Sequence, residues 1–343
     1  MKLAIHHRTG SFSDRWIKYC SEENIPFKIV NCYDSDIVSQ LHDCNGLMWH
    51  WDLNDFKATL FARQLTHSLE IKGIKVFPDI NTSWHYNDKV GQKYLLEAIN
   101  APLVPSYVFY SRTDAFDWIE KATFPKVFKL RSGASSSNVR LVKTKKEARK
   151  LIKKAFGTGF SAISPMRRFQ QRWYTANLKR DLISIKQLLG GFLRLFIPNE
   201  PEKFSKKEKG YIYFQDFVPD NAYDFRIHIV GNYCWGFQRI VRKNDFRASG
   251  SGIQQFDLSL IPSSLIQNAF DIASKLNTQS IAFDFVFNSQ NQPLLLEMSY
   301  CFGFDEEDIT YGYWLPDLVF HKAKFNPFNE SILNFIKCLK ENG

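Results

Sequence analysis

The sequence contains little cysteine and no paired cysteine motif. Its six cysteines are Cys20, Cys32, Cys44, Cys234, Cys301 and Cys338. No two of them form a C-x-x-C pair, so the spacing indicates neither a zinc site nor a disulfide framework. A chain of this kind fits a reducing compartment best.

Long apolar runs are missing as well. No stretch approaches the roughly 18 consecutive apolar residues that mark a membrane-spanning helix. The first residues, MKLAIHHRTG, have no long apolar segment behind their single lysine, so we expect no secretory signal. These absences predict a cytoplasmic protein.

The composition is that of a folded chain with a basic surface. Hydrophobic residues make up 44% and charged residues 23% of the 343 residues, and the length favours two or three domains. The net charge of +10 favours an anionic partner such as a nucleotide, nucleic acid, acidic glycan or membrane surface. Nucleic acid ranks last, because no known reading motif occurs and the basic residues are spread along the chain.

The first part of the chain alternates between short apolar runs and amphipathic segments. We expect strands at 2–5, 26–31, 46–50 and 74–77, with helices at 12–23, 34–42 and 55–72 between them. Such alternation predicts a small parallel sheet with helices on both faces, which we assign to a domain of residues 1–85.

Polar and aromatic side chains follow the first and third of these strands. They are His6, His7, His50, Trp51 and Asp52. Ligands of open α/β sheets bind beyond the carboxyl ends of the strands, so these residues are candidates for a substrate pocket. Packing or capping is the alternative role for each of them.

Two lysines and a run of small residues suggest phosphate binding. Lys89 stands in the first turn of a helix, where a cation opposes the helix dipole unless it reaches for an anion. Lys129 ends a strand, and residues 133–137 are small, so their backbone amides can close round phosphate oxygens. The loop is not a Walker loop, because no G-K-S or G-K-T follows it. A solvated lysine and an ordinary turn are the alternatives.

A basic, amphipathic segment occupies residues 160–210. Leu178, Leu182, Ile185 and Leu189 recur there at helical spacing, with Lys and Arg between them. One interpretation is a helix that lies on an anionic membrane or polymer. The other is an insert packed on its own domain with a solvated basic face. We expect residues 86–210 to form one subdomain that carries this insert.

Residues 211–343 are expected to form a second subdomain of antiparallel strands. Asp224, Arg226 and His228 alternate with apolar residues, which puts all three on one face of a strand. A turn at Gly231 and Asn232 returns the chain. Three arginines follow, at Arg239, Arg242 and Arg247. Guanidinium groups near carboxylates suit a phosphoryl-transfer site.

A hairpin late in this subdomain places two acids in apolar surroundings. Asp284 lies in the run 281–287 and Glu297 in the run 293–298, with a polar turn between the runs. Unpaired charges would be costly there. Either a divalent cation such as Mg²⁺ or a structural ion pair with Lys or Arg can meet them. These two residues alone do not choose between the alternatives.

Taken in order, the motifs resemble the ATP-grasp superfamily, and within it the branch of glutathione synthetase and the ribosomal-protein glutamate ligases. The resemblance covers residues 87–303, and the N-terminal sheet is similar to the pre-ATP-grasp domain of that family. It implies an α/β fold in which two α+β subdomains clasp ATP between them.

The resemblance also implies roles for individual residues. Lys89 and Lys129 match the phosphate-contacting lysines, and Gly133, Ser135 and Ser136 fall in the mobile glycine-rich loop. The strand that meets adenine matches Gln215, Asp216 and Phe217, and the ribose contact matches Asp224. Arg247 and Ser249 match positions that contact the nucleotide and the intermediate. The ligands of two Mg²⁺ ions match Asp284, Glu297 and Ser299, with Glu297 bridging the ions.

The implied reaction joins a carboxylate to an amine through an acylphosphate, using ATP, Mg²⁺ and small-molecule substrates. Arg247 and Lys129 would stabilise the transferring phosphoryl group, and Arg226 and Arg239 would hold the acyl group. An anionic glycan or a membrane-proximal acceptor would fit the basic insert, with the protein at the membrane periphery.

Two departures from the family pattern keep a second function open. Ser249 and Ser299 stand where the family has asparagines. A hydroxyl binds Mg²⁺ more weakly than an amide carbonyl in this setting. The alternative is therefore a nucleotide-binding or assembly protein without catalytic activity.

Overall fold

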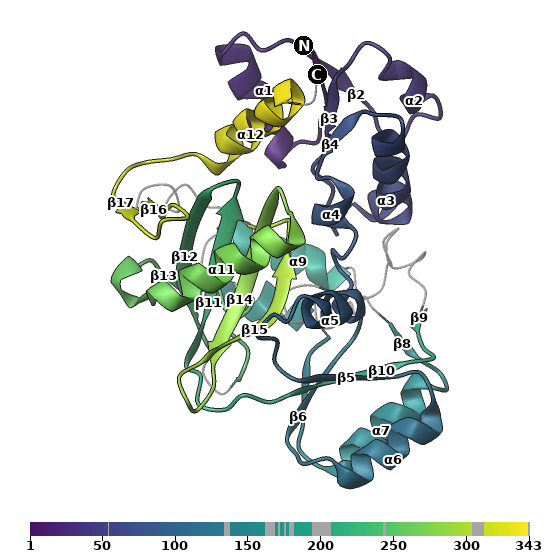
Figure 1. The fold of residues 1–343 in the computed structure, drawn as a ribbon. Helices are drawn as coiled ribbons and strands as arrows, with labels where there is room; N and C mark the ends of the chain where they lie inside the picture. Colours follow the sequence, from purple (N-terminus) through teal and green to yellow (C-terminus); the bar gives the residue numbers. More distant parts are fainter. Residues whose placement is uncertain are drawn as a thin grey trace.

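The computed structural model describes the chain apart from residues 54, 134–137, 162–168, 171, 175, 178–181, 194–206, 243–244, 304–311 and 342–343. The described residues form a four-stranded parallel sheet, a four-stranded antiparallel sheet, a seven-stranded antiparallel sheet and a two-stranded ribbon. Figure 1 shows the parallel sheet at the top, the largest sheet in the middle and the smaller antiparallel sheet at the bottom. The predicted α/β class is confirmed.

The parallel sheet has the strand order β2-β1-β3-β4. Its strands are β1 (Leu3–His6), β2 (Phe27–Val30), β3 (Gly46–Met48) and β4 (Lys75–Phe77). The helices that follow these strands are α1 (Phe12–Glu22), α2 (Ile37–Gln40), α3 (Phe56–Ile71) and α4 (Ile80–Ser83). The chain passes from β1 to β2 on one side and then to β3 on the other, so the strand order reverses between β1 and β3. Side chains just beyond these two strands are well placed to meet a ligand.

Capping side chains explain where the helices of this part begin. Ser11 accepts a hydrogen bond from the Ser13 amide at the start of α1, and Asp55 accepts one from the Ala58 amide at the start of α3. The helix predicted at 34–42 is shorter than expected. Asp34 instead closes a turn by accepting hydrogen bonds from the side chains of Asn31 and Gln40, so α2 begins only at Ile37.

The smaller antiparallel sheet has the order β5-β10-β6-β7 and lies between the first sheet and the largest one along the chain. Its strands are β5 (Ser106–Phe109), β6 (Lys126–Lys129), β7 (Arg140–Val142) and β10 (Ile212–Asp216). The helices of this part of the chain are α5 (Lys89–Ala98), α6 (Arg112–Lys121) and α7 (Lys145–Ala155), of which α5 packs through Leu96 on the largest sheet. Apolar residues of α6 and α7 pack against Phe128 and Phe214 of the sheet. This packing fixes β6 and therefore the position of Lys129 at its end.

The largest sheet has the order β15-β14-β11-β12-β16-β17, with β13 paired to β12. Its strands are β11 (Tyr223–Val230), β12 (Tyr233–Ile240), β13 (Gln254–Gln255), β14 (Ser280–Phe287), β15 (Pro293–Ser299), β16 (Tyr313–Trp314) and β17 (Phe320–His321). A short 3₁₀ turn, η1 (Leu258–Leu260), precedes α11 (Ser263–Leu276), whose apolar side packs on Phe283 and Phe285. The two predicted hairpins, β11–β12 and β14–β15, both form.

The C-terminal helix α12 (Pro327–Glu341) returns to the N-terminal part of the molecule. Figure 1 shows it beside α1, near both chain ends. Ile332 and Phe335 of α12 share a buried cluster with Trp16 of α1, and the Trp16 indole donates a hydrogen bond of 2.9 Å to the Ser331 hydroxyl. Trp314 of β16 is also largely buried, with 9% of its surface exposed. The apolar spacing of these segments is visible in the sequence, but their packing partners are not.

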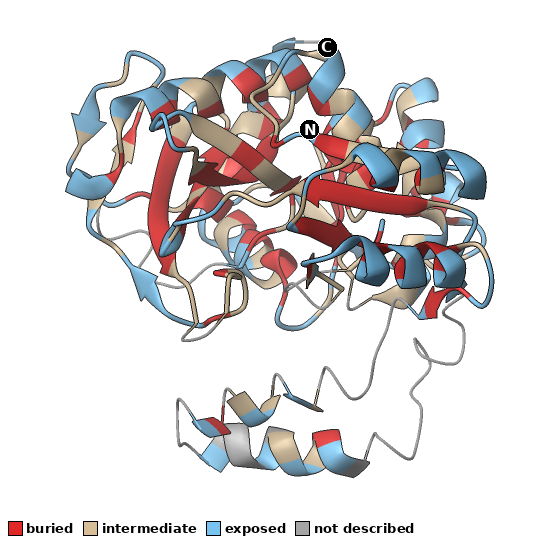
Figure 2. Cartoon of the chain, turned by 90° about the horizontal axis from the view of Figure 1, so that it is seen from below, coloured by how far each residue is buried: buried red, intermediate tan, exposed pale blue. Residues whose placement is uncertain are grey.

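The segment that follows β8 (Phe160–Ser161) and precedes β9 (Lys207–Glu208) contains the helix α9 (Leu182–Leu193). Leu182, Leu189 and Phe192 of this helix are 85%, 64% and 51% exposed. Figure 2 shows the strands of the main body buried, whereas many helical residues are exposed on their outer sides. No helix in the described part of the chain combines the length and apolarity needed to cross a membrane. The role predicted for residues 160–210 stays a prediction.

Candidate functional site

One cavity lies between the two antiparallel sheets, and most of the predicted site residues line it. They are Lys129, Gln215, Asp216, Phe217, Asp224, Arg247, Ser249, Asp284 and Glu297. A smaller adjoining cavity is lined by Lys89 and Gly133 together with Lys129 and Glu297. Ser135 and Ser136 lie outside the described residues. Residues separated by up to about 200 positions in the sequence therefore meet in one place.

Strand register brings the two predicted metal-ligating acids side by side. Asp284 of β14 pairs with Glu297 of β15 on one side and with Arg226 of β11 on the other. A register shift follows Asp284 on β14. The side chain of Asp284 is only 3% exposed, and Arg226 Nε lies 3.0 Å from its Oδ1. Carboxylates on two neighbouring strands supply the oxygen ligands that a hard cation such as Mg²⁺ prefers.

Arg239 joins Asp284 to a third acid. Its Nε and Nη2 each donate to the Asp224 carboxylate at 2.7 Å, and Nη2 also lies 2.7 Å from Asp284 Oδ2. Arg239 is 5% exposed, so carboxylates already occupy the donors that a substrate would need. The structure therefore disagrees with the prediction that Arg239 grips the acyl group. We assign it the positioning of Asp224 and Asp284, and burial raises the pKa of Asp224 to about 6.

The two predicted phosphate lysines line the smaller cavity together with Glu297. Lys89 Nζ is 3.5 Å from Glu297 Oε2 and donates a hydrogen bond of 2.7 Å to the Gly133 carbonyl. Asp88 caps the helix start by accepting from the Gly91 amide, which leaves the Lys89 side chain directed to this cavity. Burial alone would raise the pKa of Glu297, but Lys89 and Lys129 lower it to about 2. Glu297 is therefore a carboxylate throughout the physiological pH range.

Lys129 is buried at the end of β6, with 6% of its surface exposed. Burial lowers its pKa to about 8, and Glu297 opposes this shift. On the prediction that Lys129 binds a phosphate of ATP, we expect kcat/KM for ATP to fall above about pH 8, because the lysine then loses its proton and with it the attraction for phosphate. Lys129→Met should remove this limb of the pH profile. A limb that persists in the variant would contradict the assignment.

The same lysine has an opposite effect on stability. Its pKa is lower in the folded chain than the ordinary value of 10.5, so the unfolded chain binds more protons between about pH 8 and 10.5. Within that window the contribution of this lysine should make the free energy of unfolding rise with pH. Above about pH 8, kcat/KM should therefore fall while the free energy of unfolding rises, so a loss of phosphate binding can be told apart from a loss of structure.

The three side chains predicted to bind Mg²⁺ all offer oxygen atoms, which fit this ion, and Ser299 is the weakest ligand among them. Asp284 Oδ1 is buried and has no hydrogen-bond partner among the described residues, although it lies in an ion pair with Arg226. Ser299 uses its hydroxyl proton to donate to the Cys301 carbonyl at 2.6 Å. The lone pairs of the Ser299 oxygen are thus its only means of contacting a cation. Asp284 and Glu297 are therefore the stronger candidates for metal ligands.

Ion pairs also hold the predicted nucleotide-contacting residues. Asp216 accepts from Lys126 Nζ at 2.5 Å, and Arg247 Nη2 lies 2.7 Å from Asp245 Oδ2. Gln215 is buried and donates from its amide nitrogen to the Ser106 hydroxyl at 3.0 Å. These contacts fix β10 and the turn after β12 as two walls of the cavity.

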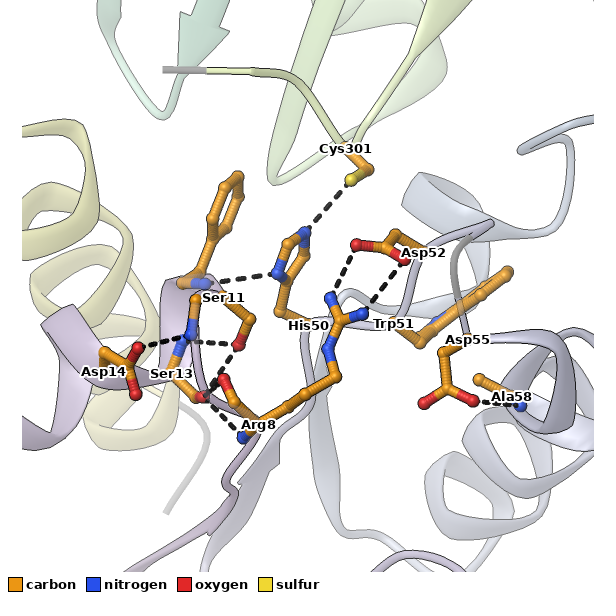
Figure 3. A network of polar contacts seen from close by, with 12 residues as sticks. Arg8, Ser11, Ser13, Asp14, His50, Trp51, Asp52, Asp55, Ala58 and Cys301 are labelled. Carbon is orange, nitrogen blue, oxygen red and sulfur yellow. Dashed lines mark hydrogen bonds and ion pairs between the residues drawn. The ribbon is translucent and has the colours of Figure 1, made fainter. Parts of the chain in front are cut away.

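A second polar cluster lies beyond the ends of β1 and β3. Figure 3 shows Arg8 against Asp52, with His50 facing Cys301, the second residue after β15. Arg8 donates from both terminal nitrogens to the Asp52 carboxylate, at 3.1 and 2.5 Å. Sequence reasoning missed Arg8, although its place two residues after β1 is the same signal that singled out His50 and Asp52. The cluster faces the strand that carries Glu297.

The other candidates from these strand ends have structural contacts. His6 accepts from the Cys32 amide at 3.0 Å, His7 pairs with Asp14 at 2.8 Å, and Trp51 is buried. The packing and capping alternative therefore describes their contacts better than the substrate pocket. Only His50 and Asp52 of the five predicted residues join the cluster.

His50, Asp52 and Cys301 each have one atom that can bind a metal ion, and these three atoms lie within 4.8 Å of one another. His50 Nδ1 accepts the Phe12 amide proton at 3.2 Å, so the neutral ring carries its own proton on Nε2, the nitrogen that faces Cys301. Burial lowers the pKa of His50 to about 3 and raises that of Cys301 to about 12. In this tautomer a proton of His50, and not a lone pair, faces the Cys301 sulfur, so the contact is a hydrogen bond. The cluster is therefore assigned to hydrogen bonding.

No protein-family model and no curated protein matches the sequence. Solved structures match over nearly the whole chain. D-alanine–D-alanine ligase from Bacillus anthracis is 14% identical, with 100% of each chain covered and a TM-score of 0.58. A RimK domain ATP-grasp protein from Sphaerobacter thermophilus is 14% identical, with 98% of this chain and 100% of that chain covered and a TM-score of 0.54.

A third match contains a bound nucleotide. It is the biotin carboxylase domain of the Hydrogenobacter thermophilus 2-oxoglutarate carboxylase, in complex with MgADP, ADP and bicarbonate. The identity is 12%, with 96% of this chain and 68% of that chain covered and a TM-score of 0.58. At such identities the likeness is one of fold.

Proposed function

We propose that this chain, which has the predicted ATP-grasp fold, is an ATP- and Mg²⁺-dependent ligase that joins a carboxylate to an amine. The convergence of Lys89, Lys129, Asp284 and Glu297 on adjoining cavities is the observation that carries the proposal. Lysines can bind phosphate oxygens and paired acids can hold Mg²⁺, which is the equipment that phosphoryl transfer needs. The narrower glutathione synthetase branch stays a prediction.

The proposed reaction has two steps. A substrate carboxylate oxygen attacks the γ-phosphorus of ATP, the bond to the β-phosphate oxygen breaks, and ADP leaves. The amine then attacks the acyl carbon, phosphate departs with the bonding electrons, and the amine loses a proton. Lys89 and Lys129 bind the transferring phosphate, while Mg²⁺ at Asp284 and Glu297 would supply charge neutralisation. Arg226, with a side chain 20% exposed, is the better placed arginine for the acyl group.

The second substrate is proposed to bind at the cluster beyond β1 and β3. The pair of Arg8 and Asp52 offers one cation and one anion, with side chains 27% and 13% exposed. Cys301 of this cluster and Glu297 are four residues apart, which is at most roughly 13 Å for a fully extended chain, and β15 ends between them at Ser299. A substrate that spans this gap could present an ionic group to the cluster and its reacting group to the phosphate site. One candidate for this second substrate is an anionic glycan or a membrane-proximal acceptor, and another is a small zwitterion.

The proposal is tested by ADP release. The full chain with ATP and Mg²⁺ should release ADP only when a pool of carboxylates and amines, such as amino acids or uronic-acid glycans, is added. Arg8→Met should raise the KM of the second substrate about tenfold and leave the KM of ATP unchanged, because one charged contact is worth about 1.4 kcal/mol. Nucleotide binding without turnover in any pool would count against a ligase.

A second candidate is a nucleotide-binding protein without catalysis. The contacts that favour it are the two arginines around Asp284 and the engaged hydroxyl of Ser299, both of which reduce affinity for Mg²⁺. Calorimetry separates the two candidates. ATP binding that neither Mg²⁺ nor Glu297→Ala changes would favour the second.

A further inference from the structure

The two residues before the small-residue loop, together with its first glycine, form a stem held by side chains from distant elements. The loop stem is defined here as Arg131, Ser132 and Gly133. The Arg131 amide donates to Glu208 Oε2 at 3.1 Å and the Ser132 amide to Glu208 Oε1 at 3.2 Å. The Gly133 amide donates to Asn87 Oδ1 at 2.7 Å. Three consecutive amides therefore have side-chain acceptors in place of strand partners.

Glu208 is the centre of this arrangement. Its carboxylate also accepts hydrogen bonds from the Ser132 hydroxyl and the Tyr211 hydroxyl. The Tyr211 oxygen in turn accepts a hydrogen bond of 2.7 Å from the Arg131 amide. Burial and then Glu208 raise the pKa of Tyr211, so its proton stays available for donation. A carboxylate accepts stronger hydrogen bonds than a neutral group, and removing it would leave the Ser132 amide without its acceptor, whereas the Arg131 amide would keep the Tyr211 oxygen.

The stem forms part of the cavity where phosphate binding is proposed. Ser132 and Gly133 line the smaller cavity together with Lys89, Lys129 and Glu297. Lys89 ties the stem to α5 twice, because its amide donates to the Arg131 carbonyl at 2.9 Å and its Nζ to the Gly133 carbonyl at 2.7 Å. A displacement of about 1 Å in groups that position a reacting phosphate can cost about a hundredfold in rate. The stem thus helps to position Lys89 in the cavity proposed for the nucleotide.

Glu208 itself belongs to β9, the first strand after residues 162–206 in the sequence. This strand pairs with β8, the last strand before those residues, so the ribbon β8–β9 joins the two described ends of the insert. The residue that holds the loop stem is therefore also the point where the basic insert is anchored.

We propose that Glu208, supported by Tyr211, is a positioning residue for nucleotide binding. It acts by holding the loop stem in place. This inference rests on the proposed function in assigning the cavity to ATP. It concerns a residue that the sequence motifs did not mark, and it links the insert to the phosphate site through one carboxylate.

The test compares three variants by calorimetry with ATP and by amide hydrogen exchange. Glu208→Ala should weaken ATP binding about tenfold and speed exchange at Arg131 and Ser132. Glu208→Gln should have a smaller effect, because one acceptor oxygen remains. The matched control is Glu147→Ala, which removes a carboxylate that accepts the Lys143 amide at 2.7 Å in the same sheet region, away from the loop stem. It should leave ATP affinity within about twofold.

A merely structural role for Glu208 predicts a different pattern. It would lower the melting temperature in Glu208→Ala and leave ATP affinity and stem exchange unchanged in the folded variant, which would overturn the proposal. Wild-type affinity in Glu208→Ala, or an equal loss in Glu147→Ala, would also overturn it. Failure of the ligase proposal would be seen separately, as ATP binding without ADP release in the wild-type chain.

Discussion

Replacing Glu297 by glutamine is expected to lower ATP turnover about 1,000-fold. Glu297 faces Lys89 at 3.5 Å and pairs in register with Asp284, so the change removes charge where phosphate, lysine and Mg²⁺ are proposed to meet. A bound metal ion is worth several kcal/mol of transition-state stabilisation, and each 1.36 kcal/mol is a tenfold rate change. Single-turnover ADP release at several Mg²⁺ concentrations measures the effect.

The control for this experiment is Glu97→Gln. Glu97 also pairs with a lysine of α5, because Lys93 Nζ lies 2.6 Å from its Oε2, but the pair lies outside the two cavities. Its turnover should stay within about twofold of wild type, as exposed ion pairs contribute little. If Glu297→Gln keeps more than a tenth of wild-type activity with unchanged dependence on Mg²⁺, Glu297 is not a metal ligand.

Replacing Arg239 by methionine is expected to destabilise the fold by about 3–5 kcal/mol, the usual effect of breaking a buried ion pair by removing one partner. Asp224 and Asp284 would keep their buried positions and lose the guanidinium that both contact at 2.7 Å. Urea unfolding followed by tryptophan fluorescence measures the change. Arg149→Met is the control, because its pair with Glu120 is exposed on both sides, at 53% and 48%, and it should change stability by less than about 1 kcal/mol.

The deficit of Arg239→Met should depend on pH with a definite sign. Burial already raises the pKa of Asp224 to about 6 in the intact protein, and removal of Arg239 would raise it further. An acid with a raised folded-state pKa is costly when ionised, so the deficit should be largest above the raised pKa of the variant and shrink as the pH falls toward about 6, where Asp224 takes up its proton in the intact protein as well. A small, pH-independent loss of stability together with a large loss of activity would restore the original view that Arg239 holds the acyl group.

Local sequence predicted the parts of the site that depend on neighbours in the chain. The hairpin of β14 and β15 was visible from two apolar runs around a polar turn, and Lys129 from the end of one apolar run. Lys89 was predicted in the first turn of a helix, and the helix does begin there, with Asp88 as its capping residue. Alternation and capping act over a few residues, so the residues themselves carry this information.

Contacts between distant segments were only partly predictable. The motif order indicated that Lys89, Lys129, Asp284 and Glu297 work together, but it did not indicate that Arg239 would be enclosed by two acids. Arg8 and Glu208 were not singled out at all, because a lone arginine after a strand and a lone glutamate in a basic segment look like ordinary surface residues.

The two acids in the β14–β15 hairpin show where sequence ends and structure begins. The sequence by itself determined that Asp284 and Glu297 lie on paired strands in apolar surroundings, and that each needs a positive partner, because burying an unpaired charge is costly. Only the tertiary structure decided the partners. Asp284 lies in register with Arg226 and against Arg239, whereas Glu297 faces Lys89 across the cavity. Which charges meet depends on how sheets distant in sequence pack, and no local pattern encodes that.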